Sequence, residues 1–281
     1  MNENVERASI LVKIAMRRIQ FIEIHDQPWL PSLFRDQITD ALQFGLNLFR
    51  GYAPIAPRLQ ALIDATNSQV ILDMCSGAGG PWIHLSRKLR GRPGNLQIRL
   101  TDKYPNVGAV ENSGKDSENH VVFYQESVNA MSVPPELKGP RTMFTSFHHF
   151  SPDQARAILQ NAVEAREGVG IFEITRRAPF TIGFMFVWVF ILWACTPWIR
   201  PFRWSRLLWT YLVPIVPFLL LFDGVVSCLR TYRPQELREI VDKLDAPKYR
   251  WEIDEQSTGK LPITFLIGYP LTVDPDHNLD G

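Results

Sequence analysis

The sequence predicts an α/β fold built on a doubly wound, mostly parallel sheet. Short runs rich in β-branched residues alternate with helix-like segments between residues 69 and 270. The length of 281 residues suits one large α/β domain, with or without an insertion. The last two strand-like runs, YRWEID and ITFLIGY, are joined only by EQSTGKLP. That linker is too short for a crossover helix, so the last pair of strands is expected to be antiparallel.

The predicted elements follow in chain order. Apolar residues at helical spacing predict helices over residues 1–20, 31–50 and 58–66, with Pro54 and Pro57 between the last two. Five strands are then predicted, at QVILDM (69–74), LQIRLTD (96–102), HVVFYQE (120–126), RTMFTSF (141–147) and GVGIFEI (168–174). Intervening and later helices are predicted at 82–89, 151–165 with Ser151 as N-cap, and 233–245. The tail at 274–281 is expected to fray.

Composition excludes several classes of function. The formal net charge is +1, whereas a nucleic-acid-binding protein needs an excess of Lys and Arg to neutralise phosphates, so no nucleic-acid partner is expected. The three cysteines are scattered without a CxxC pair, which argues against a disulfide framework and against a structural zinc site. His25, His84 and His120 show no metal-ligand spacing. No metal is therefore predicted.

The sharpest motif is the run VILDMCSGAGG at residues 70–80. A buried strand ends in Asp73, and a glycine-rich turn then leads into a helix. Glycine lets the backbone turn sharply and approach a ligand closely, and the start of a helix offers free N–H groups. Trp82 stands where a nicotinamide fingerprint has its third glycine, and the lysine of a P-loop is missing. Asp73 would repel a phosphate, but it suits a ligand that carries an ammonium group.

With these residues the sequence resembles the class I S-adenosylmethionine-dependent methyltransferases, from about Ser68 to Tyr269 apart from an apolar insert. The run LDMCSGAGG is similar to their first motif. The resemblance implies a Rossmann-like, seven-stranded methyltransferase sheet with N-terminal helices and a hydrophobic helical insert after strand five. It implies S-adenosyl-L-methionine as the cofactor, with Asp73 on the methionine amino group and the backbone of residues 76–79 around the methionine moiety.

Two further motifs follow in the family order. An acid at the end of the second strand grips both ribose hydroxyls, and Asp102 in RLTDKYP matches it. The third motif is commonly D-A-x-x-L-P, whose acid contacts the adenine amine. Here it is NAMSVP, and Asn129 departs from the pattern although its side-chain carbonyl can accept the same hydrogen bond. The implied cofactor-binding residues are Asp73, Ser76, Gly77, Ala78, Gly79, Asp102, Lys103, Asn129, Ala130 and Ser146.

The fourth predicted strand ends in TSFHHF, at the edge of the sheet where ligands bind in this kind of fold. His148 or His149 could remove a proton from a hydroxyl or phenol during attack on the sulfonium carbon. Alternatively, the pair is structural, as paired histidines can be in ubiquinone- and menaquinone-type methyltransferases, and alignment of the reactants supplies the catalysis.

Other side chains carry two interpretations each. Glu173 could orient a donor group of the substrate; alternatively, this end of the strand serves only the apolar insert, with Arg176 and Arg177 as an interfacial anchor before it. Trp29, Phe49 and Tyr52 either cap the substrate pocket or pack in the core.

Two uncharged segments, 178–199 and 207–222, separate the fifth strand from the last helix. The first would be about 33 Å long as a helix, enough to cross a hydrocarbon core of ~30 Å. The second would reach only about 24 Å, and Pro214 and Pro217 would kink it. Both ends of the insert join one sheet, so a spanning hairpin would carry the arginines between the segments across the membrane, against the usual bias. These arginines are Arg200, Arg203 and Arg206.

We therefore expect a hairpin that dips into one leaflet, with the arginines at lipid headgroups and several tryptophans as interfacial anchors. A two-helix anchor and a soluble dimer interface are the alternatives. The predicted domains are an N-terminal helical cap (1–65), a methyltransferase domain in two parts (66–177 and 224–281) and the membrane-associating insert (178–223).

The predicted function is S-adenosylmethionine-dependent methylation, at oxygen or carbon, of a lipophilic or membrane-resident small molecule. Membrane lipids are the expected partners, and the catalytic domain is expected on the cytoplasmic side. The alternative is a membrane-bound, non-catalytic binding or scaffold protein on the same fold. The sequence does not indicate the oligomeric state.

Overall fold

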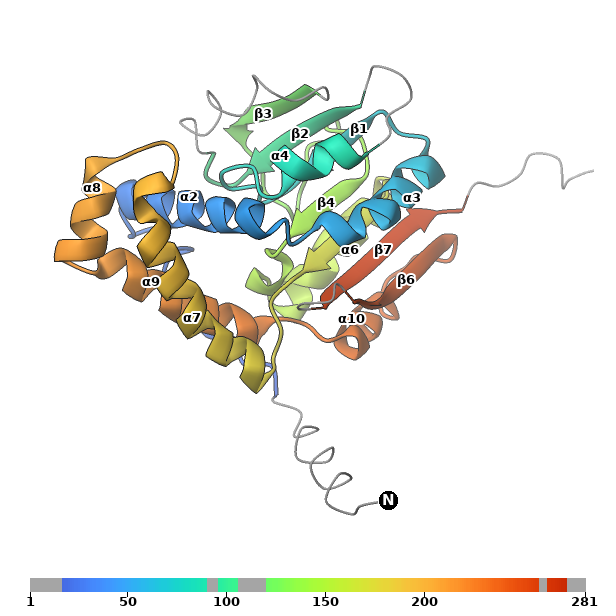
Figure 1. The fold of residues 1–281 in the computed structure, drawn as a ribbon. Helices are drawn as coiled ribbons and strands as arrows, with labels where there is room; N and C mark the ends of the chain where they lie inside the picture. The colour runs from blue at the N-terminus through green and yellow to red at the C-terminus, as the bar shows by residue number, and fades with distance from the viewer. Residues whose placement is uncertain (1–16, 90–95, 106–119, 258–261, 272–281) are drawn as a thin grey trace, which may run out of the picture.

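A computed structural model of the chain describes residues 17–89, 96–105, 120–257 and 262–271. Seven strands form one sheet in the order β3-β2-β1-β4-β5-β7-β6 (Figure 1). Their bounds are β1 Val70–Asp73, β2 Gln97–Asp102, β3 His120–Ser127, β4 Arg141–Phe144, β5 Val169–Glu173, β6 Tyr249–Gln256 and β7 Ile263–Pro270. The first five strands are parallel, and β7 runs antiparallel to β5 and β6. The predicted doubly wound, Rossmann-like methyltransferase sheet is confirmed.

Helices cover both faces of the sheet, because successive strand residues point to opposite sides and both sides are apolar. α3 (Ala56–Thr66) and α4 (Trp82–Leu85) bury their apolar side chains on one face. α6 (Pro152–Glu164) and α10 (Pro234–Val241) do the same on the other. β1 lies between these two cores, and its packing fixes the point on the sheet edge at which the chain leaves the strand.

Local predictions around the helices have different outcomes. Ser151 caps α6 as predicted: its Oγ accepts a hydrogen bond from the Gln154 N–H, and the Gln154 side chain accepts one from the Ser151 N–H. The helix predicted over residues 82–89 is shorter, since α4 ends at Leu85 and one 3-10 turn follows. Most of the helix predicted over 1–20, and the tail at 274–281, lie outside the described residues.

The apolar insert forms a helical layer beside the sheet (Figure 1). It contains α7 (Pro179–Cys195), α8 (Trp204–Leu207) and α9 (Ile215–Arg230), and α9 packs against both α7 and α2 (Ser32–Phe49). Helices α2, α7 and α9, with two residues outside them, share a third core, made of Leu30, Ile38, Ala41, Val189, Leu192, Ile199, Val216, Leu219 and Leu220. The insert is thus packed against the N-terminal helix that precedes the sheet.

The second half of the insert is broken where its prolines predict a kink. The stretch Trp204–Leu212 and the helix α9 meet at 77°, with Pro214 between them. By length and composition, the helical segment Pro179–Trp198 of 20 residues is apolar enough to cross a membrane, and the bent pair could form a second, broken span.

Arg206 is buried instead of reaching the surface. Its guanidinium pairs with the Asp40 carboxylate of α2 and donates to the carbonyls of Ile199 at 3.1 Å and Pro201 at 2.9 Å. The expectation that this arginine lies at lipid headgroups is therefore wrong: an acid on α2, remote in sequence, holds it inside. Arg200, by contrast, is exposed.

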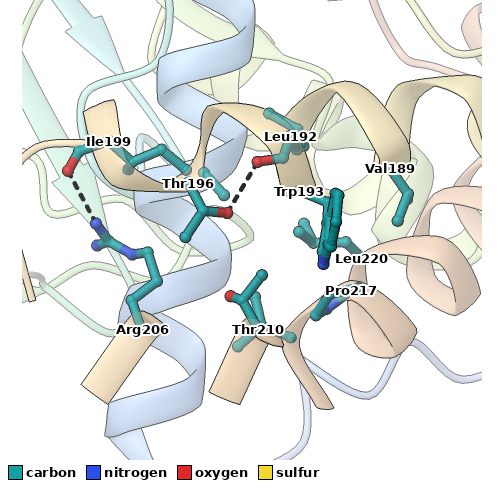
Figure 2. Close-up of a pocket in the computed structure, with 11 residues that line it drawn as sticks. Val189, Leu192, Trp193, Thr196, Ile199, Arg206, Thr210, Pro217 and Leu220 are labelled. Carbon is teal, nitrogen blue, oxygen red and sulfur yellow. Dashed lines mark hydrogen bonds between the residues drawn. The ribbon is translucent and has the colours of Figure 1, made fainter. Parts of the chain in front are cut away.

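A small cavity lies inside the insert layer, next to Arg206 (Figure 2). Leu192, Trp193 and Leu220 line it together with the hydroxyl-bearing Thr196 and Thr210. The residues around this cavity include none of the predicted cofactor-binding or catalytic positions. It is an internal feature of the insert and its packing on α2.

Candidate active site

The glycine loop, residues 73–80, connects β1 to α4 at the carboxyl edge of the sheet. Gly77 has a φ of +54° and Gly79 a φ of +102°, both in the region that favours glycine. A Cβ on Gly79 would lie only 3.3 Å from the side chains of Gln43 and Phe123. The positive φ therefore favours glycine at position 79, and a Cβ there would also press on these two side chains.

Asp73 lies beneath this loop and is buried. Ser76 Oγ and Thr142 Oγ1 each donate a hydrogen bond to its carboxylate at 2.7 Å. Burial raises the pKa of Asp73 to about 7, although the two hydrogen bonds act to lower it. A cationic group bound beside Asp73 would favour its ionised form, so binding of such a group is coupled to the loss of a proton.

Asp102 ends β2 and faces the same loop. Its Oδ2 accepts a hydrogen bond from the Gly77 N–H and its Oδ1 one from the Tyr104 N–H, both at 2.8 Å. Burial raises the pKa of Asp102, while the two N–H donors lower it. The structure therefore brings the acids of the first two sequence motifs to one loop.

The remaining predicted cofactor-binding residues lie around this edge. Asn129 Oδ1 accepts a hydrogen bond from the Met131 N–H at 3.1 Å, and the Lys103 carbonyl accepts one from Ser127 Oγ at 2.8 Å. The buried Ser146 Oγ has no hydrogen-bond partner among the residues that the structure describes. Ala78 and Ala130 are buried. Their contacts with a cofactor stay a prediction.

His148 and His149 follow β4 in a single 3-10 turn, with ring centroids 4.4 Å apart. His148 Nδ1 lies 2.8 Å from Glu173 Oε2, and the other oxygen of Glu173 accepts the backbone N–H groups of Phe147 and His148. Burial alone would raise the pKa of Glu173, but His148 lowers it below its ordinary value. Glu173 thus holds the histidine turn in place, a role that the sequence pattern did not predict.

His149 faces the segment that precedes α2. Its Nδ1 lies 2.7 Å from Asp26 Oδ2 and 3.4 Å from Glu23 Oε2. Burial lowers the pKa of His149, but the carboxylates of Glu23 and Asp26 outweigh it and raise this pKa to about 9. In this arrangement His149 is a cation at neutral pH.

Residues 17–30 are held over the histidine turn by long-range contacts. Asp223 of α9 accepts hydrogen bonds from the Ile24 N–H at 2.7 Å and the His25 N–H at 3.1 Å. Arg18 donates to the Phe150 carbonyl at 2.9 Å, and Arg230 donates to the His148 carbonyl at 3.1 Å. Sheet, insert and N-terminal segment therefore all contribute to one site.

These contacts define an acid–histidine cluster, made of Glu23, His25, Asp26, His148, His149, Glu173 and Asp223. Sequence reasoning missed its N-terminal members, because Glu23 and Asp26 meet partners more than 120 residues away. The available signal was the run EIHD at residues 23–26, a concentration of polar groups in an apolar stretch.

The three aromatic candidates have separate positions. Tyr52 is buried in the core, stacks edge-on against Phe144 and donates to the Phe172 carbonyl at 3.2 Å. Phe49 packs against Trp188 of the insert, while Trp29 is exposed. Core packing accounts for Tyr52, and Phe49 joins α2 to α7.

No protein-family model and no curated protein matches the chain. Among solved structures it is similar to the mitomycin 7-O-methyltransferase MmcR, at 13% identity and a TM-score of 0.46 over 81% of this chain and 56% of that one. It is also similar to magnesium protoporphyrin IX methyltransferase from Synechocystis PCC 6803 with bound SAM, at 9% identity and a TM-score of 0.42 over 96% and 98% of the two chains. A third similar structure is human N-acetylserotonin methyltransferase in complex with SAM, at 13% identity and a TM-score of 0.47 over 86% of this chain and 58% of that one. The chain thus spans just over half the length of the first and third of these enzymes.

Proposed function

We propose that this chain transfers the methyl group of S-adenosylmethionine to an oxygen or carbon atom of a lipophilic small molecule. The observation that carries the proposal is the placement of two acids on one glycine loop, with Asp73 beneath it and Asp102 bonded to the Gly77 N–H at 2.8 Å. S-adenosylmethionine offers an ammonium group and two ribose hydroxyls. Both need acceptors, and a pyrophosphate ligand would be repelled by the same two carboxylates.

The residues present fit this cofactor on further grounds. The carboxylate of Asp73 is able to ionise near neutrality, which suits an ammonium group. The unpaired Ser146 Oγ, at the end of β4, offers one more hydrogen-bonding group on the same side of the sheet. When bound, the cofactor supplies a sulfonium leaving group: a new bond forms between the acceptor and the methyl carbon, and the pair of the broken S–C bond stays on sulfur.

The acceptor must lose a proton in this reaction when it is a hydroxyl or phenol. His148 is the candidate base of the pair: Glu173 lies 2.8 Å from its Nδ1, so its Nε2 would take the proton. This nitrogen is buried and faces Glu23 Oε1 at 3.6 Å, so the methyl acceptor reaches it only if Glu23 moves aside. His149 is already paired with Asp26. The chain's main contribution under this proposal is alignment of the acceptor with the methyl carbon.

The proposed acceptor is lipophilic because the insert, whose helix α9 contacts the histidine turn, exposes many large apolar side chains. The most exposed of its large apolar side chains are Phe180, Phe190, Trp198, Trp204, Leu212 and Phe218, each at least 60% exposed. Such a surface is uncommon on a soluble monomer and marks an interface. Tryptophans among these residues, with exposed Arg200 nearby, fit the boundary of a bilayer, so we propose that the insert docks on the cytoplasmic leaflet.

Isothermal titration of purified protein in detergent with S-adenosylmethionine, and then with S-adenosylhomocysteine, tests the reaction class. Both should bind. Asp102→Ala should weaken binding about 100-fold, since a charge-assisted hydrogen bond contributes about 1.5–3 kcal/mol, whereas Asp64→Ala, an exposed acid on α3, should bind like the wild type. Absence of binding by folded wild-type protein would contradict the proposal and favour the scaffold function.

Flotation with anionic vesicles tests the membrane surface. The wild type should float with the vesicles, and the double variant Phe190→Ser/Trp204→Ser should remain behind. Val122→Ser removes an exposed apolar side chain of β3, outside the insert, and is the matched control. A wild type that stays in solution and remains monodisperse without detergent would overturn the membrane assignment, and a stable dimer would assign this face to a second copy.

A further inference from the structure

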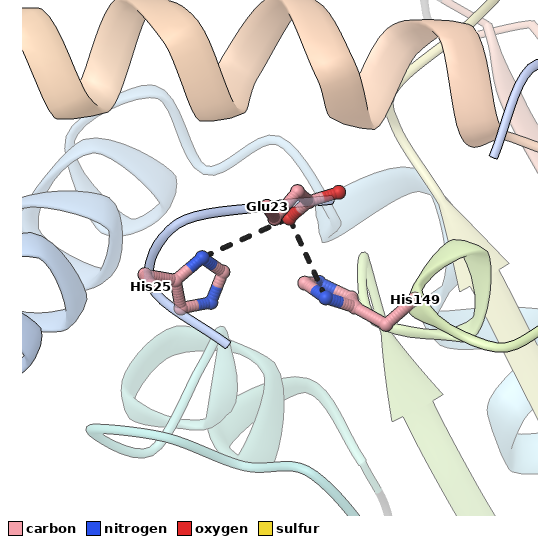
Figure 3. A group of neighbouring side chains, drawn as sticks. All are labelled: Glu23, His25 and His149. Carbon is pink, nitrogen blue, oxygen red and sulfur yellow. Dashed lines mark ion pairs between the residues drawn. The ribbon is translucent and has the colours of Figure 1, made fainter. Parts of the chain in front are cut away.

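Three side chains of the acid–histidine cluster converge in the geometry of a metal site. Glu23 lies between the imidazoles of His25 and His149 (Figure 3). Glu23 Oε2 is 3.4 Å from His149 Nδ1 and 3.7 Å from His25 Nδ1. Candidate ligand atoms of all three residues lie within 4.8 Å of one another.

Buried polar atoms at this place have no hydrogen bonds. The Glu23 side chain is fully buried, and neither of its oxygens accepts a hydrogen bond from a residue that the structure describes. His148 Nε2 is likewise unbonded there, in a side chain only 1% exposed, and it points at Glu23 Oε1 from 3.6 Å. Arg230 approaches the same oxygen at 3.4 Å. A buried carboxylate without hydrogen bonds is costly. Glu23 meets its neighbours only at ion-pair distances of 3.4–3.7 Å, which points to a further partner between these groups.

We propose that Glu23, His25 and His149 bind a divalent transition-metal ion. Two imidazoles and one carboxylate form a recurrent ligand set for zinc and for non-haem iron, with positions left open on the metal. Tetrahedral bonds of ~2.0–2.1 Å put neighbouring ligand atoms about 3.3 Å apart, close to the separations seen around Glu23 Oε2. Magnesium and calcium prefer sites made of oxygen ligands only and are not expected here.

Asp26 completes the surroundings of this site. Its Oδ2 lies 2.7 Å from His149 Nδ1, and its Oδ1 lies 3.7 Å from His25 Nε2. Asp26 therefore contacts the same His149 nitrogen that faces Glu23. A metal ion on this nitrogen would displace the proton that His149 shares with Asp26 and leave Asp26 beside the ion as a further carboxylate. The cluster is also rich in negative charge: four carboxylates meet Arg230 and three imidazoles, so one more cation is accommodated.

The site lies beside the glycine loop. Arg35 donates to the His25 carbonyl at 3.2 Å, and its guanidinium lies 4.8 Å from the centre of the Tyr104 ring, two residues after Asp102. A metal ion with an open coordination position would polarise an oxygen of any substrate group that reaches it. Metal binding itself does not depend on the proposed methyl transfer, and it is measurable without any cofactor.

The test is calorimetric titration of the chelator-treated full chain in detergent with Zn²⁺ alone, with metal content per chain measured after desalting. The wild type and His84→Ala, a histidine of α4 outside the cluster, should bind one Zn²⁺ per chain. Glu23→Gln, His25→Ala and His149→Ala should each bind at least about tenfold more weakly, and Asp26→Asn should also bind more weakly, since it removes a negative charge beside the ion. Mg²⁺ in place of Zn²⁺ should give no comparable heat.

Glu23→Gln keeps the size and shape of the side chain, so it decides the question if a histidine variant fails to fold; circular dichroism of each variant shows which have folded. The proposal is overturned if folded wild-type protein binds no Zn²⁺. It is equally overturned if Zn²⁺ binds to Glu23→Gln and His84→Ala with the same affinity, because the ion then sits elsewhere. Either result leaves the cofactor titration, and with it the proposed function, unaffected.

Discussion

The glycine loop and the acid–histidine cluster meet at one edge of the sheet, but they are assembled in opposite ways. Residues 73–80 are contiguous, and their geometry follows from one strand end and a few glycines. The cluster draws Glu23, His149 and Asp223 from three segments that only the folded chain brings together. A site built from contiguous residues leaves a motif, whereas a site built by long-range packing leaves only isolated polar residues.

The largest effect should come from breaking the packing on which the cluster depends. Arg206 of the insert is buried on Asp40 of α2, and the segment before α2 carries Glu23. Arg206→Ala should lower the free energy of unfolding by about 3 kcal/mol, because it leaves a buried carboxylate without its main partner. This loss of stability is at the low end of the range for a broken buried ion pair, because Arg203 remains 3.4 Å from Asp40. Chemical denaturation measures it.

The same variant sharpens the contrast between the two regions. Under conditions in which the variant is folded, Arg206→Ala should bind S-adenosylmethionine with wild-type affinity, because the hydrogen bonds that hold the glycine loop do not involve Arg206. Replacing both partners, Asp40→Leu/Arg206→Met, should recover most of the lost stability, because no unpaired charge is then buried. A double variant as unstable as the single one would show that packing volume, not the charge pair, matters here.

A smaller effect should come from the glycine loop itself, through the titration of Asp73. The pKa of Asp73 is about 7 in the free protein, and an ammonium group binds best to the ionised carboxylate. The ionised fraction of Asp73 rises about tenfold between pH 6 and pH 8, while the α-amino group of the ligand loses part of its charge near pH 8, so affinity for S-adenosylmethionine should rise about fourfold. Titration calorimetry at both pH values measures this. Asp73→Asn should bind weakly and without the rise; an equal rise in that variant would assign the pH dependence to another group.

The same contrast explains how much the sequence predicts. The mostly parallel, doubly wound sheet, the antiparallel last pair and the cap at Ser151 follow from local patterns and linker length, and all are present. The buried position of Arg206 does not follow, because its partner Asp40 is 166 residues away. The N-terminal run EIHD has no metal-ligand spacing of its own, since its third ligand-type partner, His149, comes from the end of β4. Spacing arguments detect residues that are close in sequence. The residues of this cluster are close only in space, because contacts with the insert hold the N-terminal segment against the end of β4.

The smallest effect tests whether the histidine turn depends on local or on long-range support. Ser151 caps α6 directly after that turn, while Arg18 and Arg230 hold the turn's carbonyls from far along the chain. Ser151→Ala should lower the free energy of unfolding by about 1 kcal/mol, the usual loss for an N-cap. Because the arginines remain, turnover should not change. A fall in turnover larger than the loss of stability explains would mean that the start of α6 positions His148, and that the turn belongs with the glycine loop among the locally determined parts of the site.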